Sequence, residues 1–287
     1  MTNLKFSATD EPRIEGDRND APVNQQKFFL STPINKVPTD PVSLSWKWSQ
    51  LNITTDQLLN TGAPVPHHLY ESEYSISYKR NENPKKFWGV TLSYGSASDQ
   101  LFRSYKTTTL NATYYFSEST DPEGRWIWLI NYSNNRTFAN GIPILGVAYL
   151  FTPSPEFTAV FGFPFAFIKS KFADGWSSSL LLGPYIYKLE VAKSLKGPLQ
   201  AYFALENSNL SFFREERSDE DDRLFYSESK ALLGMKSPVT KEMSLDGFVG
   251  LSFARALYEN DGFNPTSSDK ILLENRWFTG IQLSARF

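Results

Sequence analysis

Apolar and polar residues alternate along most of this chain, and the alternation is clearest at its end. Counted back from Phe287 to Trp277, every second residue is apolar or Thr, and the residues between are mostly small or polar. This period of two is that of a β-strand with one apolar face. The tail of a soluble domain is usually polar and frayed, so a strand that runs to the last residue is unusual.

Similar segments follow one another from residue 42 onward, with turn-forming residues between them. They lie at about 42–49, 70–78, 88–94, 110–116, 126–132, 143–151, 157–168, 177–191, 199–207, 223–235, 243–253 and 276–287. Helical periodicity is weak throughout, and no stretch reaches the roughly 18 apolar residues that a membrane helix needs. The pattern predicts an all-β fold of about 12 antiparallel strands, an even number, as in a closed bacterial barrel.

The connections between these segments differ in length in a regular way. If the C-terminus is placed in the periplasm, five of the six connections on the other side equal or exceed the longest turn on the periplasmic side; segment 170–175 is the exception. Outer-membrane barrels have short periplasmic turns and longer outer loops, whereas a soluble β-sandwich has no reason to follow this rule. We therefore expect a transmembrane, up-and-down antiparallel β-barrel over residues 42–287, with both termini periplasmic.

Composition is compatible with such a barrel. The mean hydropathy of −0.38 is low, which a barrel tolerates because only alternate residues face lipid. Aromatic residues make up 15% of the chain, and Tyr and Trp are enriched where membranes meet water. The net charge of −2 gives no basic field for a nucleic-acid partner. With no cysteine, disulfides, thiolate metal sites and cysteine nucleophiles are excluded.

The first part of the chain, residues 1–41, has a different character. It is rich in charged residues, Asn and Pro, which predicts an extended periplasmic arm without its own core. Phe28–Leu30 is a candidate docking point within it. The chain begins without the apolar core of a signal peptide, so for an exported protein of the bacterial outer membrane this sequence would be the mature form.

The segments at 143–151, 157–168 and 177–191 are apolar on both faces, unlike a strand between lipid and a watery pore. Three explanations remain open: cover by an inward-folded loop or the N-terminal arm, a subunit interface, or contact with lipid or another apolar ligand. Pro164 cannot donate to a ladder and predicts an edge, a bulge or local unpairing. The candidate subunit or lipid-contact residues are Leu145, Val147, Tyr149, Phe157, Phe161, Phe163, Phe165, Phe167, Leu180 and Leu182.

Two stretches resemble bacterial outer-membrane proteins. The end of the chain resembles the C-terminal signal that the barrel-assembly machinery recognises, through Trp277, Ile281, Leu283 and the final Phe287. The resemblance implies that this machinery is a partner during biogenesis.

The second stretch, 141–168, resembles a group of largely uncharacterised outer-membrane β-barrel proteins. It has their Pro–x–x–Gly–x–x–Tyr strand at Pro143, Gly146 and Tyr149, and then a strand that ends Gly–x–Pro at Gly162 and Pro164. In general character the chain is also similar to porin-like proteins that form rings enclosing lipid. That likeness implies a homo-oligomer in contact with membrane lipids.

Candidate catalytic and metal-binding residues are few. His67 and His68 follow two prolines at the junction of a loop and a strand, where neighbouring side chains point to opposite faces, and we interpret them as part of a solvated outer loop. The charged segment 214–223 offers oxygen ligands for a divalent cation, but it lacks the spacing and turn glycine of a calcium loop, and we interpret it as a solvated outer loop. We expect no catalytic residue, no metal and no cofactor.

Polar residues expected to face the lumen carry both signs of charge, so they predict no ion preference and no particular solute. They are Lys47, Glu71, Glu73, Lys188, Glu190, Glu228, Lys230, Gln282 and Arg286. The sequence thus predicts a non-enzymatic, porin-like barrel that forms a homo-oligomer. The alternative is a structural oligomer that binds or traps lipid without an open aqueous pore.

The barrel prediction has a simple biochemical test. We expect the purified chain to require detergent and to run as a heat-modifiable, β-rich band on a gel, because its outer strand faces would be apolar. A chain that is soluble and monomeric without detergent would contradict the barrel.

Overall fold

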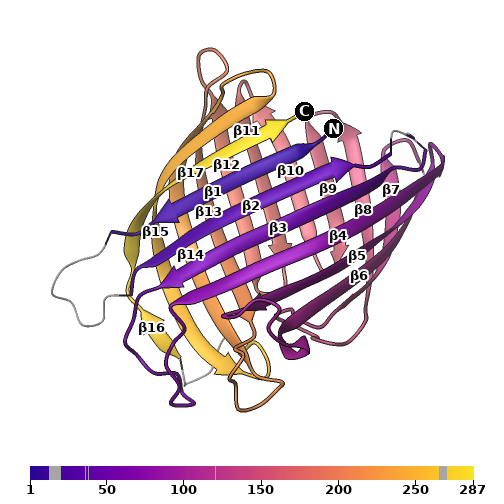
Figure 1. The fold of residues 1–287 in the computed structure, drawn as a ribbon. Coiled ribbons are helices and arrows are strands. Elements are labelled where there is room, and N and C mark those ends of the chain that lie inside the picture. The colour runs from indigo at the N-terminus through magenta and orange to yellow at the C-terminus, as the bar shows by residue number, and fades with distance from the viewer. Residues whose placement is uncertain (13–20, 36, 38, 120, 265–269) are drawn as a thin grey trace.

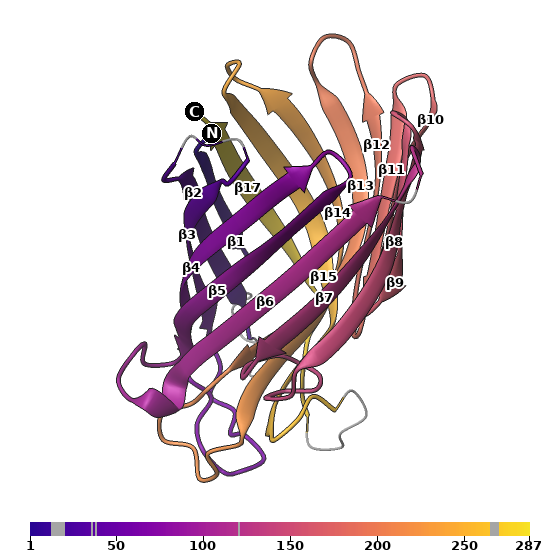
Figure 2. The same cartoon turned by 90° about the vertical axis from the view of Figure 1, so that its right-hand side faces the viewer.

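Each strand of the protein pairs in antiparallel fashion with its neighbours along the chain, and the last strand pairs with the first. A computed structural model shows the resulting closed barrel of tilted strands (Figures 1 and 2). It describes residues 1–12, 21–35, 37, 39–119, 121–264 and 270–287. Among these residues, no helix is long and apolar enough to cross a membrane.

The barrel wall consists of 16 strands, β1–β15 and β17. The short strand β16 (Ile271–Leu273) pairs only with β15, and η1 (Tyr105–Thr107) is a single turn of 3-10 helix. The wall strands are β1 Asn3–Asp10, β2 Val23–Pro33, β3 Val42–Ile53, β4 His68–Asn83, β5 Lys86–Ser98, β6 Thr108–Ser119, β7 Gly124–Ser133, β8 Ile144–Ser154, β9 Phe157–Phe163, β10 Ala166–Ala173, β11 Trp176–Gly183, β12 Ile186–Ser194, β13 Gln200–Phe212, β14 Arg223–Pro238, β15 Met243–Asn260 and β17 Arg276–Arg286.

Closure is made by β1 and β17, whose register runs from Asn3 opposite Arg286 to Asp10 opposite Thr279. At the end of this seam, the amide of Thr2 donates to the carbonyl of Phe287 at 2.8 Å, and the amide of Phe287 donates to the carbonyl of Thr2 at 2.9 Å. The final aromatic residue is therefore paired rather than frayed. A closed barrel leaves no strand edge without a partner.

The predicted number of strands was too low, and two of the missing strands come from splitting longer segments. The segment 157–168 turns at Pro164 and Phe165 to give β9 and β10, and 177–191 turns at Pro184 and Tyr185 to give β11 and β12. Because proline lacks the N–H that a ladder requires, each proline ends a strand. Each apolar segment was thus a hairpin whose tight turn contained no charged residue to mark it.

The other two missing strands lie in the predicted N-terminal arm, so the prediction that residues 1–41 form an arm was wrong. β1 and β2 are wall strands, and Phe28–Leu30 lies within β2. Charged and Pro-rich residues of the connections dominated the composition and hid a short alternation: Leu4, Phe6 and Ala8 share one face of β1. Residues 13–20 of the predicted arm lie outside the described residues.

The two ends of the barrel differ in their connections. Both termini lie at one end (Figure 1), where 34–41 is the longest connection and several turns have only two residues. The opposite end carries 11–22, 54–67, 99–107, 134–143, 213–222 and 261–275, and we call it the long-loop end. Segment 170–175 is no exception after all, because its turn, Asp174–Gly175, lies at the terminal end. The long-loop end does have two short turns, 164–165 and 184–185.

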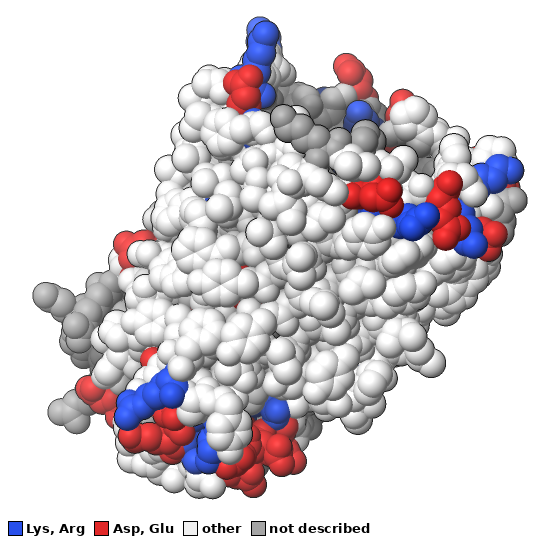
Figure 3. All heavy atoms as spheres, turned by 45° about the vertical axis from the view of Figure 1, so that its right-hand side comes forward, with Lys and Arg blue, Asp and Glu red and all other residues white. Residues whose placement is uncertain are grey.

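The outer face of the barrel is apolar over a broad zone. Figure 3 shows a wide band almost without charged side chains between rims that carry them. Large side chains such as Tyr74, Ile76, Trp128 and Leu145 are exposed on this face. Their sequence neighbours point to the lumen, because successive side chains of a strand alternate.

The β1–β17 seam gives a test of closure at a single residue. Ala8 pairs with Ile281 on one side and Gln26 on the other, so we expect Ala8→Pro to prevent closure because proline removes an N–H from the ladder. The heat-modifiable gel band should then be lost. Ala8→Val is the matched control, since it keeps the N–H and adds only an outward apolar group. Normal folding of Ala8→Pro would show that the seam is dispensable.

Candidate functional site

Many polar and charged side chains point into the lumen. Strands β12–β15, β17 and β1–β3 enclose a lumenal cavity of about 560 Å³. Six lysines line it, at positions 5, 27, 47, 188, 230 and 236, together with the carboxylates of Glu190, Glu206 and Asp246. Five of the residues predicted to face the lumen therefore line one cavity: Lys47, Lys188, Glu190, Lys230 and Gln282.

Four of these lysines form ion pairs. Nζ of Lys47 lies 2.6 Å from Oε1 of Glu71, and Nζ of Lys188 lies 2.9 Å from Oε2 of Glu206. Nζ of Lys236 lies 3.0 Å from Oε1 of Glu190. The fourth pair, Lys230 with Glu228, has an Nζ–Oε1 distance of 2.5 Å and is almost wholly buried.

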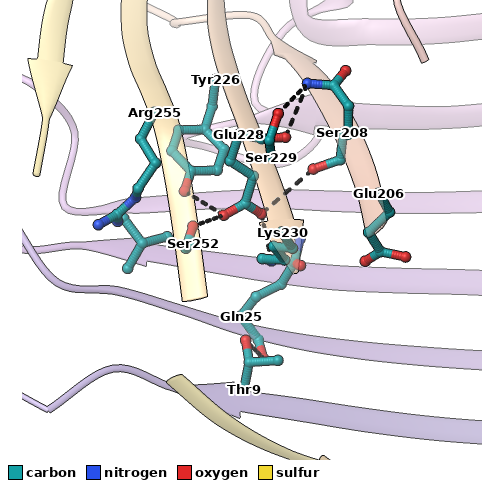
Figure 4. Close-up of polar contacts among 12 residues, drawn as sticks. Thr9, Gln25, Glu206, Ser208, Tyr226, Glu228, Ser229, Lys230, Ser252 and Arg255 are labelled. Atoms are coloured by element: carbon teal, nitrogen blue, oxygen red, sulfur yellow. Dashed lines mark hydrogen bonds and ion pairs between the residues drawn. The ribbon is translucent and has the colours of Figure 1, made fainter. Parts of the chain in front are cut away.

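Glu228 is the centre of a polar network on the inner wall (Figure 4). Besides its pair with Lys230, its Oε2 accepts hydrogen bonds from the hydroxyls of Tyr226 and Ser252, each at 2.9 Å. Its side chain is 2% exposed. A buried charge is tolerated when its remaining hydrogen-bonding positions are filled, and this network fills them. The network therefore ties β14 to β15 along the inner wall.

A second buried ion pair connects the loop after β1 to β15. Nη2 of Arg255 lies 3.0 Å from Oε2 of Glu11, and the same oxygen accepts a hydrogen bond from the amide of Val23 at 2.7 Å. Burial raises the pKa of the Glu11 carboxyl, and the charge of Arg255 offsets part of that rise. The pair holds the start of the connection 11–22 inside the barrel.

An apolar core fills the lumen near the long-loop end on the same side. Inward residues from β2–β5 and β13–β15, among them Leu51, Phe212 and Leu257, pack with Leu59 and Val65 of the connection 54–67. Leu59 and Val65 are each 3% exposed, so this connection folds into the barrel rather than away from it. The core closes one half of the lumen to water.

Two strands on opposite sides of the ring meet at the long-loop end. As many strands separate β5 from β13 in one direction around the barrel as in the other. Even so, the amide of Phe213 donates to the carbonyl of Ala97 at 2.7 Å, and Ser98 and Phe213 form a parallel bridge. We call this contact the pinch. It divides the long-loop end into a half that the apolar core fills and a half bounded by β6–β12.

Side chains of three connections hold the pinch in place. Arg214 makes two hydrogen bonds to the carboxylate of Glu259, at 2.9 and 3.0 Å, and the hydroxyl of Thr61 donates to the same carboxylate at 3.0 Å. Oγ of Ser104 donates to Glu215 at 2.9 Å. On the surface, Lys106 pairs with Glu220 at 2.5 Å, a contact that raises the pKa of Lys106.

The predicted solvated loop at 214–223 is therefore partly a structural element. Arg214 is buried, and the segment bonds to the connection 99–107 and to Glu259 of β15. Of the charged residues that suggested a cation site, Arg214 pairs with Glu259 and Glu220 pairs with Lys106. Among the described residues, no group of three His, Asp or Glu side chains could hold a metal ion.

The predicted histidine pair also has local partners. Nδ1 of His67 lies 3.2 Å from the carbonyl oxygen of Ile53, and Nδ1 of His68 lies 2.8 Å from Oδ1 of Asn52. Both contacts join β4 and the residue before it to β3. These contacts indicate a structural role for both histidines where β3 meets β4.

The lumen wall from β7 to β11 carries a band of apolar side chains. One row of paired residues runs through Leu150, Val160, Phe167, Leu181 and then Lys188 on β12. Ile127, Leu129 and Ala148 lie on the same face nearer the long-loop end. Directly paired residues share a face of the sheet, and Lys188 lines the cavity, so the whole row faces the lumen. Arg125, Lys169 and Lys171 share this face nearer the terminal end, so the lumen has one side lined by ion pairs and another side with an apolar band.

The candidate contact residues lie on this same wall, and most of them point outward. Leu145, Val147, Phe161, Phe163 and Leu182 are exposed on the outer face. Phe167 differs, because the turn at 164–165 places it opposite Val160 on the lumen face. Treating 157–168 as one strand wrongly put Phe167 on the same face as Phe161.

The predicted cover by an inward-folded loop or the N-terminal arm takes another form in the described residues. The core that the inward-folded connection 54–67 enters consists of residues outside β7–β11, and β1 and β2 belong to the barrel itself. The connection 54–67 therefore packs on the other side of the lumen, and β1 and β2 of the predicted arm add strands to the wall. The sequence analysis missed the pinch and five residues of the lumenal cavity. These residues are Lys5, Lys27, Glu206, Lys236 and Asp246. The alternation in β1 and β2 could have indicated Lys5 and Lys27.

The outer face carries an apolar groove of about 750 Å³ over β2–β7, lined by residues such as Trp46, Tyr74, Ile76 and Leu92. The groove runs across β4 and β5, from Leu30 and Thr32 of β2 to Tyr132 of β7. A smaller hollow of about 360 Å³ includes Leu145 and Val147 of the predicted contact surface.

Comparisons with known proteins give similarity of fold only. No family model and no curated protein matches the chain. An outer membrane channel from Pseudomonas putida F1 is 8% identical, with a TM-score of 0.41, and the match covers 100% of this chain and 95% of that one. A deletion mutant of the monoaromatic hydrocarbon channel TodX is 7% identical, with a TM-score of 0.43 and coverage of 100% and 89%.

Salmonella typhi OmpF in complex with daunomycin is 9% identical, with a TM-score of 0.39 and coverage of 99% and 97%. The three solved structures are two outer-membrane channels and a porin.

The two ion pairs of the pinch, Arg214–Glu259 and Lys106–Glu220, differ in burial. They should therefore differ in what they contribute to the free energy of unfolding. We expect Glu259→Ala to lower the free energy of unfolding by about 3–5 kcal/mol, because it leaves the Arg214 charge buried without a partner. Glu220→Ala, which breaks the exposed pair with Lys106, should have little effect. Urea titration in detergent micelles measures both. Equal effects would contradict the structural role of the buried pair.

Proposed function

We propose that this protein is a non-enzymatic, porin-like channel of a bacterial outer membrane. The observation that carries the proposal is the opposite polarity of the two barrel faces: a band almost without charge outside, and lysines with carboxylates inside. Lipid requires the first and water favours the second. A soluble barrel would have no use for an exposed apolar band of this width.

The proposed solute path follows the apolar side of the lumen. Buried ion pairs and the apolar core occupy the charged side toward the long-loop end. The half bounded by β6–β12 has the short turns 164–165 and 184–185 at its rim, and its inward residues Val160, Phe167 and Leu181 are only partly buried. The proposed path runs through this half, past the connection 134–143, whose Asn135 bonds to Ser211 of β13.

The proposed orientation has the termini and the short turns in the periplasm and the long-loop end outside. It follows from the asymmetry of connection lengths in bacterial barrels. The paired strand end at Phe287, with Trp277 and Ile281 exposed to the lipid side, supports recognition by the barrel-assembly machinery during insertion. Leu283 lies on the same face by alternation.

The second candidate function is a homo-oligomer that binds or traps lipid without an open pore. The groove over β2–β7 favours it, because a smooth barrel would not offer a concave apolar surface of about 750 Å³. The outward residues of the β8–β11 wall, with the hollow at Leu145 and Val147, could contact lipid or a second subunit.

Conductance of the detergent-purified protein in a planar bilayer tests the channel. We expect stable steps that grow with salt concentration, because ions would cross a water-filled lumen. Leu181→Trp, which adds bulk on the lumen face, should lower the step size. Leu182→Trp on the adjacent outward position should leave it unchanged, and is the matched control.

Two outcomes separate the candidates. Equal conductance of both variants and the native protein would place the ion path elsewhere. No conductance from folded, inserted protein would contradict the channel, and lipid retained through detergent purification would then favour the oligomer that traps lipid.

A further inference from the structure

Two lysines of the lumenal cavity differ from the other four. Lys5 on β1 and Lys27 on β2 line the cavity and are exposed to it. Neither forms an ion pair with a carboxylate anywhere in the described ranges, whereas Lys47, Lys188, Lys230 and Lys236 each do. A cation inside a protein is unfavourable unless water or an anion compensates it, so these two positions are suited to an anion.

The two lysines lie close to each other on neighbouring strands. Lys27 pairs with Ser7, and Lys5 pairs with Phe29, so the lysines occupy diagonal positions on the same face of the sheet. Side chains at diagonal positions are within reach of one another. Two ammonium groups that flank one space repel each other, and an anion placed between them removes that repulsion.

The carboxylates of the cavity are already engaged. Glu190 and Glu206 pair with Lys236 and Lys188. Oδ1 of Asp246 accepts a hydrogen bond from the hydroxyl of Tyr202 at 2.9 Å. Two lysines of the lining, Lys5 and Lys27, therefore remain available to a ligand. One carboxylate of the lining, Asp246, has no lysine partner among the described residues.

Apolar side chains form part of the same lining. Leu232, Phe248 and Phe278 lie on the wall from β14 to β17, and Phe29 is 38% exposed on β2 beside Lys5. A cavity of about 560 Å³ is of the size that small organic ligands occupy. An inorganic anion is hydrated and gains nothing from contact with apolar side chains. The lining therefore suits an anion that has an apolar part.

We propose that this cavity binds a small organic carboxylate, with the carboxylate between Lys5 and Lys27 and the apolar part against Phe29 and Phe248, which are not fully buried. The site belongs to the lumen of the proposed channel and gives that channel a class of solute. From the site, the row Lys188, Leu181, Phe167 and Val160 leads onto the apolar wall. A molecule that carries one charge and one apolar part matches both sides of the lumen.

Isothermal titration calorimetry with benzoate, on the full chain in a non-ionic detergent, tests the site without relying on conduction. We expect saturable binding of benzoate, and much weaker binding of both benzamide and inorganic phosphate. Lys5→Gln/Lys27→Gln should weaken benzoate binding at least about tenfold, because two charged contacts are lost. Lys5→Arg/Lys27→Arg should restore most of it.

The matched control is Lys169→Gln/Lys171→Gln, which removes two lysines from the lumen face of β10, outside the cavity. It should bind benzoate as the native protein does. The proposal is overturned if the native protein shows no saturable binding, if benzamide or phosphate binds as tightly as benzoate, or if the Lys5 and Lys27 variant retains full affinity. The heat-modifiable band confirms that each variant is folded.

Binding and conduction can fail separately. Benzoate binding by a protein that does not conduct would keep the site and reject the channel. Conduction without benzoate binding would keep the channel and reject the site.

Discussion

The seam between β1 and β17 closes the barrel, because the backbone N–H and C=O groups of these two strands find their partners in each other. Without it, two strand edges would have no partner, and in the proposed membrane setting lipid would offer none. Closure explains why a charged, Pro-rich N-terminal region contributes strands: β1 and β2 complete the ring. Both termini lie at one end of the barrel (Figure 1), because a chain that makes an even number of up-and-down strands ends where it began.

The pinch between β5 and β13 gives the lumen its shape. A circular ring would keep these strands far apart, but backbone hydrogen bonding and the buried Arg214–Glu259 pair hold their ends together. Inside, the contact separates the half that the apolar core fills from the half bounded by β6–β12. One contact thus accounts for the asymmetry of the lumen at the long-loop end.

Much of the candidate site was readable from residue type and alternation. Lys47, Lys188, Glu190 and Lys230 alternate with apolar residues, so their lumen position followed from strand parity. The sequence did not reveal that Lys5 and Lys27 belong to the same cavity, because their strands were hidden among charged connections. Nor could it reveal that Phe213 meets β5, since that contact joins positions far apart in the chain.

The sequence by itself determined the all-β class, the alternation of most strands, the polarity of the two faces and the unequal connection lengths. These depend on local periodicity, which each strand carries in its own residues. Only the tertiary structure decided the number of strands, the partner of each terminal strand and the division of the lumen. Pro164 shows why: the residue ends a strand in either case, but whether the next segment turns back or continues depends on which partners are available across the ring.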